Sequence, residues 1–410
     1  MARAFSSEVA SGSRKENASK QQAGASFRFN PNGKGSSPAK NLLRFLCASA
    51  ALLLCAAALT FIVDPLQLFR PARLFAAMYS SDTRMQNAGL IRSQPFDTVF
   101  MGTSLAIHFR QSDIDQALRV RSLKLAMTGT NSHEQSFVLA AALQRHPKRV
   151  IWAMDDWIFC DGAEIDDDIY LPADLYRRNV RGIAGYLLSG AMARESAWIL
   201  ARSVPLLERI VARLTTDAVF NFTISDVDDI NAFRPDVEAP YDATRATAAF
   251  AHITHPSRRA GLSEGYDYQR MVRNFENDTV RLIADHPDVV FDIYFPPYSI
   301  LQWVAMRDAS PGALKIVYDL TAHIGHRLAE LPNVRLHDFR DVNEVTHDLG
   351  NYADVIHHSP SVDLKVLSWL ASGTYLVDGA APGAALERLK AQVEAYQVEA
   401  YQVEADRIAR

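Results

Sequence analysis

An uncharged, strongly apolar run from Phe45 to Val63 constrains this 410-residue chain more than any other feature of its sequence. As an α-helix with a rise of ~1.5 Å per residue, the 19 residues of the run would cover about 28 Å of hydrocarbon. A buried core helix is the alternative. The run is isolated, however, and follows a polar segment, residues 1–40, whose composition is typical of a disordered tail. We therefore predict a transmembrane signal anchor over residues 41–63.

Basic residues on either side of the run predict its orientation. Lys34, Lys40 and Arg44 precede it closely, which places the N-terminus in the cytoplasm, although Arg70 and Arg73 on the far side reduce this bias. No small-x-small cleavage site ends the run, so an uncleaved anchor is favoured over a removed signal peptide. The sequence thus predicts a single-pass protein of a bacterial inner membrane, with its main body in the periplasm.

The charge and cysteine content of the remaining chain exclude several partners. Residues 1–45 hold eight of the 43 Lys and Arg residues and two of the 47 Asp and Glu residues, which leaves 35 basic and 45 acidic residues, a net charge of −10. A body of this charge is a poor binder of nucleic acid. Because Cys47 and Cys55 lie in the apolar run, Cys160 has no partner for a disulfide or a cysteine-based metal site. We expect no metal and no other cofactor.

Short apolar segments alternate with helical patterns along the body, which we place at residues 95–375. Expected helices lie at 137–143 and 313–331, and apolar segments with strand character lie at residues 98–101, 122–127, 150–154, 289–295 and 334–338. This alternation predicts an α/β fold with a mainly parallel sheet covered on both faces. Right-handed crossovers would bring the C-terminal ends of the strands to one edge of that sheet.

Three further segments complete the predicted organisation. Residues 64–94 read as a connector. Residues 376–410 read as a C-terminal tail that repeats Gln-Val-Glu-Ala-Tyr, and we expect a solvated helix or a frayed tail without chemistry there. The interval from about 158 to 265 interrupts the strand pattern with an acidic run, Asp166–Asp168, and with helices expected at 175–188 and 198–214. It is predicted to be a helical insertion. A lid over a site and a plain structural elaboration both remain open.

Two distant motifs could meet at the sheet edge and form a catalytic site. Gly102-Thr103-Ser104 follows the first strand, and Asp354-Val355-Ile356-His357 follows the last. A serine hydroxyl needs an imidazole to accept its proton, and the imidazole needs a carboxylate to fix its tautomer. Either motif alone is weak evidence, since Ser104 could cap a helix and Asp-x-x-His is short enough to arise by chance. His358 also competes with His357 as the base, although the spacing favours His357.

Over residues 97–372, apart from the insertion, these motifs resemble the SGNH hydrolase superfamily, also called GDSL-like, and its membrane-anchored branch that acylates envelope polymers. The resemblance implies a three-layer α/β/α sandwich with Ser104 as nucleophile and His357 and Asp354 as base and orienting carboxylate. It also implies Gly129, in Met-Thr-Gly-Thr-Asn, as a backbone donor to the oxyanion. The expected activity is an O-acyl, most simply acetyl, esterase or transferase acting on a carbohydrate polymer. The alternative is a non-catalytic partner of a membrane-bound O-acyltransferase.

The sequence departs from the family pattern at two positions. Thr103 stands where the family often has Asp, and Asp155 stands after the third strand where an Asn would supply a donor to the oxyanion. An ionised carboxylate cannot donate, and loss of one such donor typically costs about 2.7 to 4 kcal/mol in the transition state. Asn131 is a candidate replacement. Otherwise Asp155 is protonated, organises the site through hydrogen bonds to backbone amides or His133, or marks a slow or non-catalytic site.

Overall fold

The computed structural model of the 410-residue chain describes residues 37–160, 171–177, 179–204, 222–229 and 241–397. Several sequence-based predictions fall outside these residues. They are the disordered tail over 1–36, the acidic run Asp166–Asp168, the end of the second expected insertion helix over 205–214, and the pentapeptide repeat beyond residue 397.

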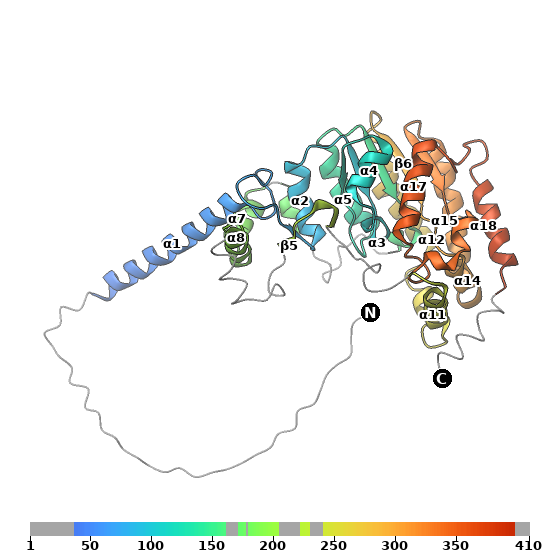
Figure 1. Ribbon diagram of the computed structural model, residues 1–410, viewed down its shortest axis with the longest axis horizontal. Helices are drawn as coiled ribbons and strands as arrows, with labels where there is room; N and C mark the ends of the chain where they lie inside the picture. The colour runs from blue at the N-terminus through green and yellow to red at the C-terminus, as the bar shows by residue number, and fades with distance from the viewer. Residues whose placement is uncertain (1–36, 161–170, 178, 205–221, 230–240, 398–410) are drawn as a thin grey trace, which may run out of the picture. The chain divides into compact units, whose positions relative to one another are not determined.

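A five-stranded, all-parallel sheet forms the centre of the main body, which confirms the predicted mainly parallel α/β arrangement (Figure 1). The strands, in the order β3-β2-β4-β6-β7 across the sheet, are β3 (Ser122–Lys124), β2 (Thr98–Met101), β4 (Arg149–Ala153), β6 (Val290–Phe295) and β7 (Val334–Asp338). The chain passes from β2 outward to β3 and returns to β4 on the other side of β2. This order creates a topological switch between β2 and β4, the place where open parallel sheets bind ligands at their carboxyl edge.

Successive residues of the strands enter different hydrophobic clusters, as expected where side chains alternate across a strand. Val99 and Met101 belong to one cluster and Phe100 to another. The first cluster also takes side chains from α2 (Thr83–Ser93), α5 (Ser132–Leu143) and α15 (Pro311–Ala329), and the second from α4 (Gln111–Leu118) and α17 (Pro360–Ser372). Helices therefore supply apolar side chains to both sets of strand residues.

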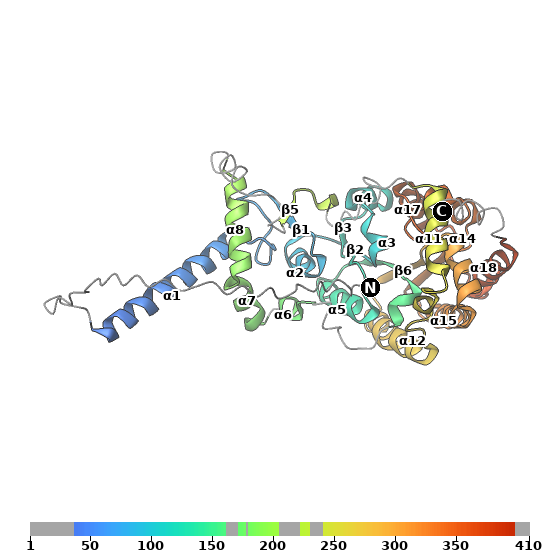
Figure 2. The same cartoon turned by 90° about the horizontal axis from the view of Figure 1, so that it is seen from below.

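A third cluster joins α11 (Ala243–Thr254), α14 (Ile300–Ala309) and α18 (Ala384–Ala395), which lie side by side in both views (Figures 1 and 2). Residues 384–395 form a helix, one of the two forms expected for the C-terminal tail, but one face of this helix is buried and not solvated. Leu386, Leu389 and Val393 of α18 are buried, and their spacing of three and four residues makes one apolar face. The neighbouring repeat of period five obscures this pattern in the sequence.

The insertion and the connector carry more structure than their sequence suggested. The connector contains α2 and the short strand β1 (Tyr79–Ser80), which pairs antiparallel with β5 (Phe222–Ile224) of the insertion. The first expected insertion helix, at 175–188, forms as two short helices, α6 (Ala173–Tyr176) and α7 (Val180–Leu187). The second, expected to begin at residue 198, begins earlier, as α8 (Gly190–Arg202). The remaining helical segments are α3 (Ser104–Ile107), α12 (Tyr268–Asn274), α13 (Arg281–Ala284) and α16 (Asn343–Thr346), with short 3-10 or π turns at Asp156–Phe159, Val227–Asp229, Arg259–Leu262, Phe275–Val280 and Leu349–Asn351.

The predicted apolar helix is present as α1 (Pro38–Val63). It has 26 residues and a mean hydropathy of 2.5 in its most apolar 18-residue window, so by length and composition it could cross a membrane. It begins three residues before the predicted boundary at residue 41.

Candidate active site

Ser104 stands at the point where the chain leaves β2 and enters α3. Thr103 caps α3 in extended conformation, with φ −90°, and its hydroxyl accepts a long hydrogen bond of 3.4 Å from the Leu105 amide. Gly102 is required before this turn, because a Cβ there would lie 2.6 Å from that of Ala106 and 2.8 Å from that of Ala153. The tight approach of α3 to β4 therefore fixes Ser104 at the carboxyl edge of the sheet.

The structure brings the three predicted triad residues together in that order. Ser104 Oγ lies 3.0 Å from Nε2 of His357, and Nδ1 of His357 lies 2.6 Å from Oδ2 of Asp354. A hydroxyl proton on Ser104 can thus pass to His357 while Asp354 accepts the hydrogen bond from Nδ1. The side chain of His357 is 15% exposed, so the site is reachable from solvent without being fully hydrated.

Asp354 is held as an anion by the loop that carries it. Its Oδ1 accepts hydrogen bonds from the backbone amides of Ile356 and His357 at 2.8 and 2.7 Å. Burial alone would raise the pKa of Asp354, but the hydrogen bonds from the His357 ring and these amides outweigh burial and bring the pKa below its ordinary value. A charged carboxylate therefore faces the imidazole at neutral pH.

His358 points away from this site, which resolves the choice between the two adjacent histidines. Its side chain is fully buried, with Nδ1 3.1 Å from Oδ1 of Asp363 in α17, and its ring packs edge-on against Phe109. His357 is the histidine that contacts Ser104. His358 instead joins the packing of α17 beneath the site.

Asp155 is fully buried at the end of β4, and both of its carboxylate oxygens accept hydrogen bonds from hydroxyls. Thr103 donates to Oδ2 at 2.6 Å, and Tyr298 donates to Oδ1. Burial raises the pKa of Asp155 to about 6, and the hydrogen bonds from Thr103 and Tyr298 limit the rise. Asp155 therefore does organise the site through hydrogen bonds, but its partners are Thr103 and Tyr298 instead of backbone amides or His133. His133 lies near another acid, with Nδ1 3.7 Å from Asp278.

The two remaining predicted site residues lie on the loop between β3 and α5. Gly129 is exposed and has left-handed backbone with φ 57°, while Asn131 caps α5 by accepting from the Glu134 amide at 2.9 Å. Capping occupies Oδ1 of Asn131, so Nδ2 is the group that could donate to a ligand. Arg84 of α2 secures this loop through the carbonyls of Thr128 and Gly129 and a two-point ion pair with Glu134.

Tyr298 is the residue near the site that was missed in the sequence. Tyr298 follows the Pro-Pro pair that ends β6, so its position at the carboxyl edge was a usable signal. His108, like His133, lies close in sequence to the predicted Ser104 and Gly129 loops, so either is a candidate from the sequence to line a substrate cleft. His108 follows α3, and the centre of its ring lies 6.2 Å from that of His357. Burial lowers the pKa of His108 to about 3, which makes it a neutral neighbour of the triad.

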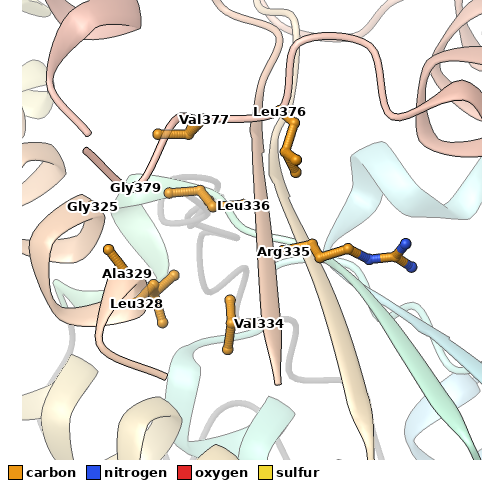
Figure 3. A pocket seen from close by; sticks show the side chains of 9 residues that line it. All are labelled: Gly325, Leu328, Ala329, Val334, Arg335, Leu336, Leu376, Val377 and Gly379. Atoms are coloured by element: carbon orange, nitrogen blue, oxygen red, sulfur yellow. The ribbon is translucent and has the colours of Figure 1, made fainter. Parts of the chain in front are cut away.

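A separate pocket of about 150 Å³ lies elsewhere in the body, lined by residues of α15, β7 and the segment after α17 (Figure 3). Its lining is mostly apolar, and the guanidinium of Arg335 points away from the other labelled side chains to pair with Asp292. It is smaller than the roughly 300 to 1,000 Å³ of ordinary ligand sites. It contains none of the predicted site residues, so we do not assign it to the chemistry.

Within the described residues, no group of three or more His, Cys, Asp or Glu side chains is arranged to hold a metal ion. Comparison of the sequence with protein-family models and with curated proteins finds no match. The site geometry and the motif resemblance are therefore the features of this chain that bear on its function.

Proposed function

We propose that this chain is a membrane-anchored serine esterase or O-acyltransferase of the SGNH type, built as a three-layer α/β/α sandwich. Its substrate would be an acyl ester, most simply acetyl, on an envelope or extracellular polysaccharide. The observation that carries the proposal is the pair of contacts from Ser104 to His357 and from His357 to Asp354, at 3.0 and 2.6 Å. Ser104 is about 250 positions from Asp354 and His357 in the sequence, and the three residues come together at the carboxyl edge of the sheet. The order of the strands in the sheet is consistent with a site there, because Ser104 follows β2, which flanks the topological switch where open parallel sheets bind ligands.

In this mechanism the Ser104 oxygen attacks the ester carbonyl carbon while His357 Nε2 takes the hydroxyl proton. The bond from the carbonyl carbon to the leaving alcohol then breaks, and His357 returns the proton to that alcohol. The acyl group remains on Ser104 as an ester. Water, or an alcohol of the acceptor, is next deprotonated by His357 and attacks this ester, which frees the acyl group and restores the Ser104 hydroxyl. Asp354 stabilises the positive charge on His357 in both steps.

The negative charge that develops on the carbonyl oxygen needs hydrogen-bond donors. By the family resemblance, the Gly129 amide is one. In this proposal Asn131 Nδ2 supplies the donor that Asp155 cannot, since the cap of α5 uses only Oδ1 of Asn131. The remaining chemistry requires no metal ion.

The second candidate function is a non-catalytic SGNH-fold partner of a membrane-bound O-acyltransferase. One observation favours it: the end of β4 supplies Asp155, which offers no donor to an oxyanion. In that function the same edge of the sheet would bind the polymer without forming an acyl-enzyme.

Covalent labelling separates the two functions. The full chain in nanodiscs is treated with a fluorophosphonate probe and compared with Ser104→Ala and with Ser361→Ala, a control at an exposed serine of α17. Labelling of the wild type and of Ser361→Ala but not of Ser104→Ala supports the enzyme. Absence of labelling and of p-nitrophenyl acetate turnover, together with retained polysaccharide binding, supports the binding partner. Turnover with and without an oligosaccharide acceptor then distinguishes transfer from hydrolysis.

A further inference from the structure

The end of α1 is anchored to the main body by a single buried carboxylate. Asp64 adopts left-handed backbone, φ 52°, immediately after the helix, and is fully buried. Its two oxygens accept hydrogen bonds from the amides of Leu68, Phe69 and Arg70 at 2.8 to 3.1 Å, and from the Tyr186 hydroxyl at 3.0 Å. The chain therefore turns sharply at the end of the apolar helix instead of continuing as a loose linker.

The turn is packed against α2 with no clearance. A Cβ on Gly89 of α2 would lie 1.6 Å from the Leu66 carbonyl oxygen, so only glycine allows this approach. Gln86 donates to the same carbonyl at 3.3 Å, and Leu66 is completely buried. Because α2 also holds the Gly129 loop through Arg84, it forms a direct structural link from the end of α1 to the proposed site.

The amphipathic helix α7 packs directly against the turn that follows α1. Tyr186 of α7 bonds Asp64, and its ring packs 6.1 Å from that of Phe69, which in turn lies 5.0 Å from Phe61 of α1. Both views show α7 and α8 at the end of α1 that joins the main body (Figures 1 and 2). Where α1 leaves a bilayer, α7 must therefore lie close to the bilayer surface.

The opposite face of α7 carries apolar side chains with no cover. Val180 is 84% exposed and Leu188 is 53% exposed. Leu188 caps α7 eight positions after Val180, which places the two within about 80° of each other around the helix, whereas Tyr186 is about 120° from Val180 and about 160° from Leu188. Leu74, in the segment after the turn, is 74% exposed.

The segments that carry these apolar residues have an excess of basic over acidic residues. We define the juxtamembrane collar as residues 64–76 together with the described residues 171–177 and 179–204. It contains three acids, of which Asp64 and Glu195 are buried, against six arginines: Arg70, Arg73, Arg177, Arg181, Arg194 and Arg202. A formal charge of +3 in a chain of net charge −4 is complementary to anionic phospholipid.

We propose that the juxtamembrane collar lies on the surface of the bilayer that α1 crosses, with Val180 and Leu188 at the boundary of headgroups and acyl chains and the arginines at anionic headgroups. This inference rests on the membrane anchoring in the proposed function. It adds that the body is held against the bilayer. The Ser104 site would then lie at a fixed height above the membrane and act on substrate at that height.

The test uses the full chain in nanodiscs of phosphatidylcholine and phosphatidylglycerol, with its three native cysteines replaced. Single spin labels are placed at Val180, Leu188, Leu54 of α1 and Leu364, an exposed leucine of α17 outside the collar. Collision with oxygen, which concentrates in lipid, is compared with collision with a water-soluble nickel complex. The oxygen-to-nickel ratio at Val180 and Leu188 should exceed that at Leu364 by about threefold, as for residues at the interface, and should be highest at Leu54.

Each other outcome overturns a specific statement. Ratios at Val180 and Leu188 equal to that at Leu364, with Leu54 in lipid, reject the collar contact while leaving the anchor intact. An aqueous Leu54 rejects the anchor itself. Labels at Val180 and Leu188 shielded from both reagents indicate a protein partner and reject a lipid surface. The double charge reversal Arg177→Glu and Arg181→Glu should lower the ratio at Leu188 in phosphatidylglycerol nanodiscs but not in pure phosphatidylcholine, and an unchanged ratio rejects the role of charge.

Discussion

Two carboxylates at the same edge of the sheet have opposite environments. Asp354 accepts hydrogen bonds from three N–H groups, those of the Ile356 and His357 backbones and of the His357 ring, and its pKa is lowered. Asp155 accepts from two hydroxyls in a fully buried position, and its pKa is raised to about 6. Donor type and burial thus separate two residues of the same chemical kind.

The difference assigns them different tasks in the proposed mechanism. A permanent anion beside an imidazole stabilises the charge that forms when the serine proton is taken. A buried acceptor of hydroxyl hydrogen bonds fixes the orientation of those hydroxyls and of the backbone that carries them. Asp354 fits the first task, and Asp155 fits the second through Thr103, the residue before Ser104.

The largest effect on turnover should come from replacing Ser104 or His357, the two residues that exchange the proton. We expect Ser104→Ala and His357→Gln each to lower p-nitrophenyl acetate turnover by about 10⁴-fold or more, with little change in thermal midpoint. His358→Gln is the matched control. It should keep most of the turnover but lower the free energy of unfolding by about 1 to 3 kcal/mol, because Asp363 loses its buried partner. Loss of turnover only in His358→Gln would mean that the base is misassigned.

The next effect compares the two carboxylates directly. Asp354→Asn should lower turnover by about 10³- to 10⁴-fold, since an amide no longer selects the productive tautomer of His357. Asp155→Asn should change turnover by less than about tenfold, because the altered group does not touch the reacting atoms. Turnover of both variants is measured at pH 7. A rise of about 100-fold in Asp155→Asn would instead place residue 155 against the oxyanion as a missing donor.

A smaller effect concerns stability: Asp155, unlike Asp354, should make the free energy of unfolding decrease as the pH rises. The ordinary pKa of Asp155 is 3.8 and its folded pKa is about 6. Well below pH 3.8 the group is protonated in both states and costs nothing. As pH rises toward 6 the unfolded chain ionises first, so the folded state loses up to about 3 kcal/mol relative to a neutral residue. The stability of Asp155→Asn relative to wild type should therefore increase between pH 4 and 7 in urea unfolding of the full chain in detergent. A constant difference over that range would contradict the raised pKa.

Part of this comparison could be predicted from the sequence. The strands at 98–101 and 334–338 match β2 and β7 because short apolar segments between turn residues leave few other structures for the chain. The rule that parallel strands end at one edge then placed Ser104 near His357. The choice between His357 and His358 needed the structure, because neighbouring residues of a loop can face opposite sides and both have the chemistry of a base.

The environment of Asp155 could not be predicted with the same information. Its contact with Tyr298 joins residues 143 positions apart, and its depth depends on how β6 and α14 pack behind it. From its sequence position alone, Asp155 stands where the family has an Asn that donates to the oxyanion. The missing physical information was which hydroxyls reach its oxygens, and only the tertiary arrangement supplies that.

The smallest effect concerns Thr103, the residue that connects the two carboxylate environments. Its hydroxyl donates to Asp155 and accepts from the Leu105 amide at the start of α3. Thr103→Val keeps the shape of the side chain but removes both hydrogen bonds, so the free energy of unfolding should fall by about 1 to 2 kcal/mol. If this cap also orients the adjacent Ser104, turnover should fall by about tenfold, whereas Thr103→Ser should restore both quantities. The Thr103→Val effect should be smaller in an Asp155→Asn background, because the two residues act through one contact. Full turnover in a destabilised Thr103→Val would limit the Asp155 network to stability and leave Ser104 positioned by Gly102 and β4 alone.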